Sequence, residues 1–143
     1  MYQHILVAIE HSNADETILK HVEQLAKLTG ASLLLVHVAD GWVARHYDDL
    51  TLMESEEMQG DRAYLDQLAA KLNAAGLPTR TRLALGDPAT ELIKTVGEEN
   101  VDLIAMSTHG HRFLNDLLRG TTVDRVRHEV RVPVLLLRAP PPK

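Results

Sequence analysis

The chain has 143 residues, 45% of them apolar and 24% charged, with a formal net charge of −5 and no cysteine. This composition suits one globular domain with a sizeable core, and it excludes disulfides, thiol catalysis and cysteine metal sites. The acidic balance argues against nucleic acid as a partner, and no apolar run reaches the roughly 20 residues of a membrane span, so we expect neither partner.

The first part of the chain has the pattern of a strand, a helix and a second strand. Residues 5–9 and 32–38 are continuous apolar runs, which are typical of strands buried on both faces of a parallel sheet. Between them, apolar residues recur at helical spacing, with Ser12 or Asn13 available as the N-cap and Gly30 as the stop. The helical positions are Ile18, Val22, Leu25, Ala26 and Leu28.

The middle of the chain predicts a long helix, an edge strand and a capped helix. After an irregular stretch over 40–52 that contains the only tryptophan, a helical pattern runs from Met53 to Ala75. Residues 79–85 alternate threonine and arginine with apolar residues, which is typical of a strand at the edge of a sheet. Asp87 is placed to cap the next helix and Pro88 to open it.

The last third predicts two more strands with a helix between them. Residues 101–106 form an apolar run, Val123, Val126 and Val130 follow at helical spacing, and residues 132–137 are valine or leucine except for Pro133. A proline cannot donate to a ladder, so we expect this last strand at a sheet edge. Strand and helix alternate throughout, which predicts one α/β domain over residues 1–139 with a five-stranded parallel sheet covered on both faces. Residues 140–143 are expected to form a disordered tail.

A glycine-containing stretch separates the fourth predicted strand from the helix that follows. Ser107-Thr108-His109-Gly110 is followed, after nine residues, by Gly120-Thr121-Thr122. Small and hydroxylated residues at this place favour phosphate binding, because glycine admits a close backbone approach and the N–H groups of a helix start attract anions. An ordinary strand-to-helix loop with two turn glycines fits the same pattern.

Ligands of open α/β sheets bind beyond the carboxyl ends of the strands, at the point where the strand order reverses. If the first and fourth predicted strands are neighbours at that point, their carboxyl ends border one crevice. Glu10 would then face the glycine-containing stretch. A carboxylate there suits the hydroxyls of a ribose or the amino edge of a base, whereas loop N–H groups with Thr121 and Thr122 suit phosphates. The backbone beside Ala39 is placed to contact an adenine edge.

Five motifs in this order resemble the universal stress protein domain over essentially the whole chain. They are residues 5–12, the second strand with its ending His37-Val38, the turn Gly86-Asp87-Pro88-Ala89, the stretch from Thr108-His109-Gly110 to Gly120-Thr121, and the start of the last strand at 132–135. The resemblance implies a Rossmann-like three-layer sandwich with the strand order 3-2-1-4-5. It also implies a homodimer through the last strand, Val132 to Leu137. For the members of the family that bind nucleotide, it implies ATP or AMP as the ligand, with Mg²⁺ accompanying the phosphates.

The crevice and the resemblance together predict a nucleotide-binding set. Its members are Ala8, Glu10, Val38, Ala39, Met106, Ser107, His109, Gly110, His111, Arg112, Gly120, Thr121 and Thr122. The chain departs from the family pattern at two of these positions, since Ser107 stands where the family has glycine and Glu10 where it usually has aspartate.

The main functional hypothesis is an adenine-nucleotide-binding regulatory or stress-response protein in the cytoplasm, a location with which the absence of cysteine is compatible. The alternative is a nucleotide-free, dimeric interaction or chaperone-like stress protein of the same fold. A dedicated enzyme is a third hypothesis, but the first loop, residues 10–14, lacks the glycine-rich signatures of ATP pyrophosphatases and nucleotidyl transferases, and there is no Gly-x-Ser-x-Gly elbow. We therefore expect at most slow ATP hydrolysis. The eight histidines lack the spacing of a metal site, so no metal site is expected.

Overall fold

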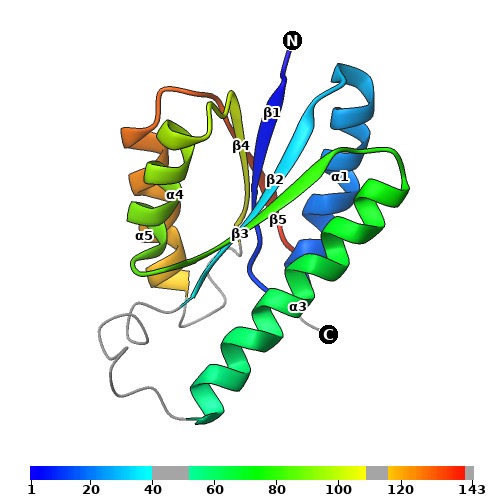
Figure 1. Ribbon diagram of the computed structural model, residues 1–143. Helices are drawn as coiled ribbons and strands as arrows, with labels where there is room; N and C mark the ends of the chain where they lie inside the picture. Colours follow the sequence, from blue (N-terminus) through cyan, green and yellow to red (C-terminus); the bar gives the residue numbers. More distant parts are fainter. Residues whose placement is uncertain (40–51, 109–115, 141–143) are drawn as a thin grey trace.

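Five parallel strands form one sheet in the order β3-β2-β1-β4-β5, which confirms the predicted fold class and strand order (Figure 1). The computed structural model describes residues 1–39, 52–108 and 116–140. The predicted irregular stretch with Trp42 lies almost wholly outside these residues. The strands are β1 (His4–Ala8), β2 (Ser32–Ala39), β3 (Thr79–Leu85), β4 (Leu103–Thr108) and β5 (Val134–Arg138).

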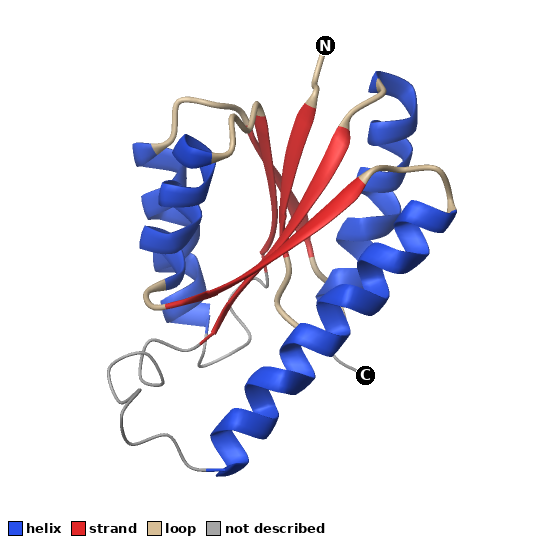
Figure 2. Ribbon diagram, viewed as in Figure 1, coloured by secondary structure: helices blue, strands red, loops and turns tan. Residues whose placement is uncertain are grey.

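Four helices cover the two faces of the sheet and complete three layers (Figure 2). They are α1 (Ala14–Thr29), α3 (Leu52–Ala74), α4 (Pro88–Glu98) and α5 (Asp116–Glu129). Helices α1 and α3 lie on one face of the sheet, and α4 and α5 lie on the other. None of the helices in the described part of the chain is both long and apolar enough to cross a membrane.

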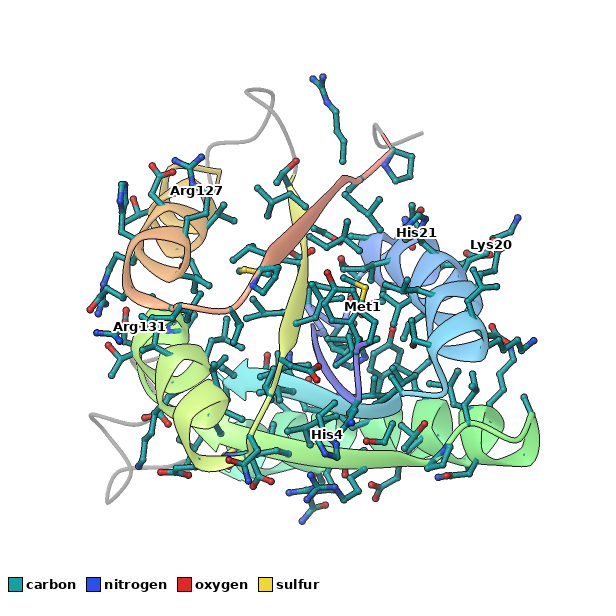
Figure 3. All side chains as sticks on the ribbon, turned by 90° about the horizontal axis from the view of Figure 1, so that it is seen from above. Met1, His4, Lys20, His21, Arg127 and Arg131 are labelled. Atoms are coloured by element: carbon teal, nitrogen blue, oxygen red, sulfur yellow. The ribbon has the colours of Figure 1, made fainter. Side chains whose placement is uncertain are left out.

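The sheet is buried on both faces because successive side chains of a strand point to opposite sides. Ile5 and Val7 belong to a core cluster under α1 and α3, together with Leu33 and Leu35 of β2. Leu6 belongs to a second cluster under α4 and α5. Side chains fill the space between sheet and helices on both sides, whereas Lys20, His21 and Arg127 point outward from their helices (Figure 3). The continuous apolar runs of the sequence are explained by this two-sided burial.

Strand β1 occupies the centre of the sheet, and the strand order reverses beside it. It pairs with β2, where Ala8 lies opposite Val36, and with β4, where Val7 lies opposite Ala105. At its amino end, the carboxylate of Asp102 accepts hydrogen bonds from the backbone N–H groups of Gln3 and His4, at 2.8 and 3.1 Å. All strands end at the same edge of the sheet, which we call the carboxyl edge.

Several predicted boundaries are confirmed by local geometry. Gly30 ends α1 in the left-handed conformation with φ of 76°, and its N–H donates to the Ala26 carbonyl. Asp87 caps α4 by accepting a 2.9 Å hydrogen bond from the backbone N–H of Thr90. Both β3 and β5 lie at sheet edges, as predicted. Strand β5 begins directly after Pro133, and the buried Ala139 extends its ladder through a 2.7 Å hydrogen bond to the Thr108 carbonyl.

Candidate functional site

Six of the predicted site residues lie at the carboxyl edge of the sheet. Ala8 ends β1, Ala39 ends β2 directly after Val38, and Met106 and Ser107 lie in the last three residues of β4. Glu10 follows β1 by two positions. Because β1 and β4 are neighbours at the reversal of strand order, these residues lie where the sequence predicts a crevice.

Three of these side chains share one face of the sheet. Met106 is buried in the cluster under α4 and α5, and Ala8 and Val38 pack against the same cluster. By strand alternation, Ala39 and Ser107 point to the other face, where Leu137, the partner of Ser107 in β5, joins the cluster under α1 and α3. The predicted set is therefore split between the two faces of the sheet, with an apolar group on the α4 and α5 side.

The side chain of Ser107 is buried, and its hydroxyl has no hydrogen-bond partner among the residues that the structure describes. The residue is only 7% exposed, and no hydrogen bond to its side chain is formed within residues 1–39, 52–108 and 116–140. A buried hydroxyl that lacks a partner costs roughly 1–3 kcal/mol. Such a group at the carboxyl edge suits a contact with a bound polar molecule.

The structure corrects the predicted position of Gly120, Thr121 and Thr122. They were expected in the loop before a helix, but α5 already begins at Asp116, so they lie inside it. Leucine and arginine at positions 117–119 are strong helix formers, and one interior glycine costs only about 1 kcal/mol. The N–H groups that a helix leaves without an internal partner belong to its first four residues, which here precede Gly120. His109, Gly110, His111 and Arg112 lie outside the described residues.

The turn between β1 and α1, residues 9–13, is held from within by the carboxylate of Asp15. This carboxylate accepts hydrogen bonds from the backbone N–H groups of Glu10, His11 and Ser12, at 2.8, 2.8 and 3.1 Å. Asp15 is 1% exposed. Ser12 adds a local contact, because its hydroxyl donates to the carboxylate of Glu10 at 3.1 Å. The turn that carries Glu10 is thus fixed in one conformation.

Helix α3 supports this turn from the other side. The hydroxyl of Tyr64 donates a 2.8 Å hydrogen bond to Asp15, and its ring stacks on that of His11 with centroids 4.0 Å apart. Burial, followed by this hydrogen bond and the negative charge of Asp15, raises the pKa of Tyr64 well above its ordinary value. His11 has a positive φ of 65°, and its Nδ1 lies 2.6 Å from an Asp61 oxygen. A non-glycine residue holds this conformation only where its surroundings fix it.

His37 joins the same network from β2. Its Nδ1 donates a 2.7 Å hydrogen bond to the carbonyl of Ile9, and its Nε2 lies 3.5 Å from Asp61. Although His11, His37 and Asp61 meet here, no group of three or more histidine, aspartate or glutamate residues in the described part of the chain is arranged to hold a metal ion. The hydrogen bond from His37 to Ile9 connects this network to the end of β1.

Sequence reasoning missed Asp15, Asp61 and Tyr64. Asp15 could have been found, because Ser12-Asn13-Ala14-Asp15 has the spacing of a capping box, in which an acidic side chain reaches back to the N-cap region. Asp61 and Tyr64 belong to a helix far along the chain, and their spacing carries no local signal of a contact with the first turn.

A groove of about 640 Å³ lies between α1 and α3, on the face opposite Ala8, Val38 and Met106. Its lining includes His11, Tyr64, Lys20, Lys71 and Leu72. None of the predicted nucleotide-binding residues in the described part of the chain lines it. The groove borders the network around Asp15 through His11 and Tyr64.

Comparison with known proteins gives matches along nearly the whole chain. The model of the universal stress protein family matches residues 1–138. Universal stress protein MJ0577 of Methanocaldococcus jannaschii is 25% identical over 155 residues, covering 96% of each chain. The solved structure of MJ0577 is similar with a TM-score of 0.82, at 24% identity and covering 99% of both chains.

Two further similar structures contain adenine nucleotides. One is a universal stress protein in complex with cAMP, with a TM-score of 0.69 at 20% identity, covering 96% of this chain and 97% of the other. The second is a universal stress protein from Archaeoglobus fulgidus in complex with dAMP, with a TM-score of 0.68 at 17% identity, covering 94% and 97%. At these identities, the similarity shows a shared fold.

Proposed function

The chain belongs to the universal stress protein family, and from that premise we propose that it is a regulatory or stress-response protein that binds an adenine nucleotide, ATP or AMP, at the carboxyl edge of its sheet. The observation that carries the proposal is the meeting of Ala8, Val38 and Met106 on one face, beside the reversal of strand order between β1 and β4. This is the place where open α/β sheets bind ligands.

Two observations add support. The buried hydroxyl of Ser107 has no hydrogen-bond partner among the described residues and lies at the same edge, where a ligand would supply one. Two proteins of similar fold are complexes with cAMP and dAMP, so this architecture accommodates an adenine nucleotide.

The proposed orientation places the nucleoside at the β1–α1 turn and the phosphates toward the segment that leads to α5. Glu10 carries a carboxylate that suits ribose hydroxyls, and a phosphate beside it would be repelled. The segment with Gly110 and Arg112, followed by the N–H groups of the first turn of α5, would hold the phosphates, and Mg²⁺ would accompany those of ATP. The carboxylate and the phosphates would then lie at opposite ends of the ligand.

We also propose that the protein forms a homodimer through β5. This strand is at the edge of the sheet and carries Leu136, which is 37% exposed. An apolar edge strand without cover promotes aggregation, and pairing with its own copy about a two-fold axis removes the open edge.

The direct test is the nucleotide content of the purified protein. We expect adenine nucleotide in the ligand fraction released by heating, identified by mass spectrometry, and saturable binding of ATP or AMP to the emptied protein by calorimetry. A nucleotide-free preparation that shows no heat of binding with either ligand would contradict the proposal. It would support the alternative of a nucleotide-free dimeric interaction protein.

A further inference from the structure

The β1–α1 turn has the N–H groups of an anion site, but the chain fills that site with its own carboxylate. Successive backbone N–H groups at the start of a helix form a concave site for phosphate in many α/β proteins. Here three of them, from Glu10, His11 and Ser12, converge on the side chain of Asp15. A phosphate oxygen could use these donors only by displacing the carboxylate.

The carboxylate of Asp15 is firmly held in this position. It is 1% exposed and accepts a fourth hydrogen bond, from the hydroxyl of Tyr64. Tyr64 stacks on His11, and His11 is held by Asp61. Displacing Asp15 would leave a buried charge without its hydrogen bonds, which is strongly unfavourable.

We infer that Asp15 is a positioning residue that sets the direction in which a nucleotide lies in the crevice. By occupying the three N–H groups of the turn, it excludes phosphate from this end and holds Glu10 in the geometry that meets the nucleoside. The negative charges of Asp15 and Glu10 on the same turn act together against a phosphate there. This inference rests on the proposed function, because it concerns the nucleotide that the crevice would bind.

The test examines the two ends of the ligand one at a time, by measuring the affinities of the protein for adenosine and for inorganic tripolyphosphate. In Asp15→Asn, asparagine has the same shape as aspartate, but its amide nitrogen donates a hydrogen bond where a carboxylate oxygen accepted one. In the full-length protein we expect this variant to bind adenosine about tenfold more weakly, as for the loss of one to two hydrogen bonds. Its affinity for tripolyphosphate is expected to be unchanged or higher, because the phosphate end is untouched and a negative charge is gone.

Glu16→Gln provides the matched control. Glu16 is the next residue in the same first turn of α1 and is exposed, so this variant makes the same change of charge outside the network. It should leave both affinities at the wild-type values. Tyr64→Phe keeps the carboxylate but removes one of its four hydrogen bonds, and we expect it to weaken adenosine binding by a smaller factor in the same direction.

A purely structural role for Asp15 would lower both affinities together or lower only the melting temperature. An unchanged ratio of adenosine to tripolyphosphate affinity in Asp15→Asn would therefore overturn the inference. If that variant does not fold, an unchanged ratio in Tyr64→Phe has the same meaning. The proposed function fails in a different way, namely if the wild-type protein binds neither adenosine, AMP nor ATP.

Discussion

The hydroxyl of Tyr64 donates a 2.8 Å hydrogen bond to the carboxylate of Asp15, although 49 positions separate the two residues in the sequence. The bond joins α3 to the first turn of α1, and Asp15 in turn holds the backbone of Glu10. A long helix on one face of the sheet thus supports the turn at which we place the nucleoside.

Glu10→Ala is expected to lower the affinities for ATP and for adenosine by the same factor, about tenfold or more. A hydrogen bond to a charged group contributes roughly 1.5–3 kcal/mol. Isothermal calorimetry with both ligands measures this. Glu98→Ala, which removes an exposed carboxylate of α4, is the control and should change neither affinity. If Glu10→Ala instead strengthened ATP binding, the carboxylate would lie near the phosphates and the proposed orientation would be wrong.

Gly120→Val is expected to abolish the rise in melting temperature that ATP gives the wild-type protein. At a concentration 100 times the dissociation constant, a ligand stabilises the folded state by about 2.7 kcal/mol. A branched side chain at position 120, in the second turn of α5, would crowd the helix start at which we propose that the phosphates bind. Gly97→Ala, in α4, is the control, because a Cβ added there would meet no described atom within 4 Å beyond its chain neighbours and the backbone of its own helix. If ATP still raised the melting temperature of Gly120→Val, the phosphates would bind elsewhere in the protein.

Ser107→Ala should have opposite effects on the free and the ligand-bound protein. Removing a buried hydroxyl that has no partner among the described residues relieves its desolvation cost, so the melting temperature of the nucleotide-free protein should rise by a few degrees. If the hydroxyl contacts the nucleotide, the affinity for ATP should fall several-fold at the same time. Differential scanning fluorimetry with and without ATP measures both effects, and an equal rise in both states would remove Ser107 from the site.

The wild-type protein is expected to scatter light as a dimer, with about twice the chain mass of 15.9 kDa. Leu136→Lys should give monomer or aggregate, because it places a charge in a desolvated interface. Leu135 is unsuitable for this test, since it packs against the core under α1 and α3. Leu28→Lys, at a position 86% exposed on α1, is the control and should stay dimeric. A monodisperse wild-type monomer at micromolar concentration would contradict the prediction.

Asp87 should contribute to stability only above the pH range in which its carboxyl is protonated. The side-chain and backbone hydrogen bonds from Thr90, with a smaller contribution from Arg125, hold the pKa of Asp87 below its ordinary value of 3.8. Because the folded-state pKa is lower than the unfolded one, the contribution is complete above 3.8 and is lost as the pH falls through the lowered pKa.

Denaturant unfolding of Asp87→Asn and Asp87→Ala tests this dependence. Asparagine can still cap α4, so the loss of unfolding free energy in Asp87→Asn measures the contribution of the carboxylate charge. This loss should disappear as the pH falls below 3.8. At pH 7, Asp87→Ala should cost about 1 kcal/mol, as for the loss of an N-cap. If the loss of unfolding free energy in Asp87→Asn stayed constant with pH, the ionised carboxylate would contribute nothing to stability.

The elements of the sheet could be predicted because each signal is local. The apolar runs at residues 5–9 and 32–38 belong to strands buried on both faces, and Gly30 ends a helix by its own conformation. The stretch Gly120-Thr121-Thr122 is predicted to precede a helix, but α5 already begins at Asp116 and contains it. Glycine signals flexibility of the backbone, but a helix tolerates one such residue at a modest cost.

The site could be predicted only where it depends on strand ends. Glu10 and Ser107 follow from the rule that parallel strands end at one edge, so a sequence can place them. The support of Glu10 by Asp15 and Tyr64 could not be predicted as a whole, since helical spacing explains Tyr64 equally well as a core residue. Which side chain of α3 reaches the first turn is decided by the packing of α3 on the sheet.

The central place of β1 has a consequence for folding. Its carboxyl end is held by His37 of β2, but its second neighbour is β4, and Asp102 binds the N–H groups of residues 98 and 99 positions earlier. During synthesis β1 is made before β4, so one of its edges stays open until the residues between the two strands have been made. Contacts of such long sequence separation form slowly, because a large loop must close before they are gained. Strand β1 therefore has an unpaired edge in nascent chains until β4 is available to cover it.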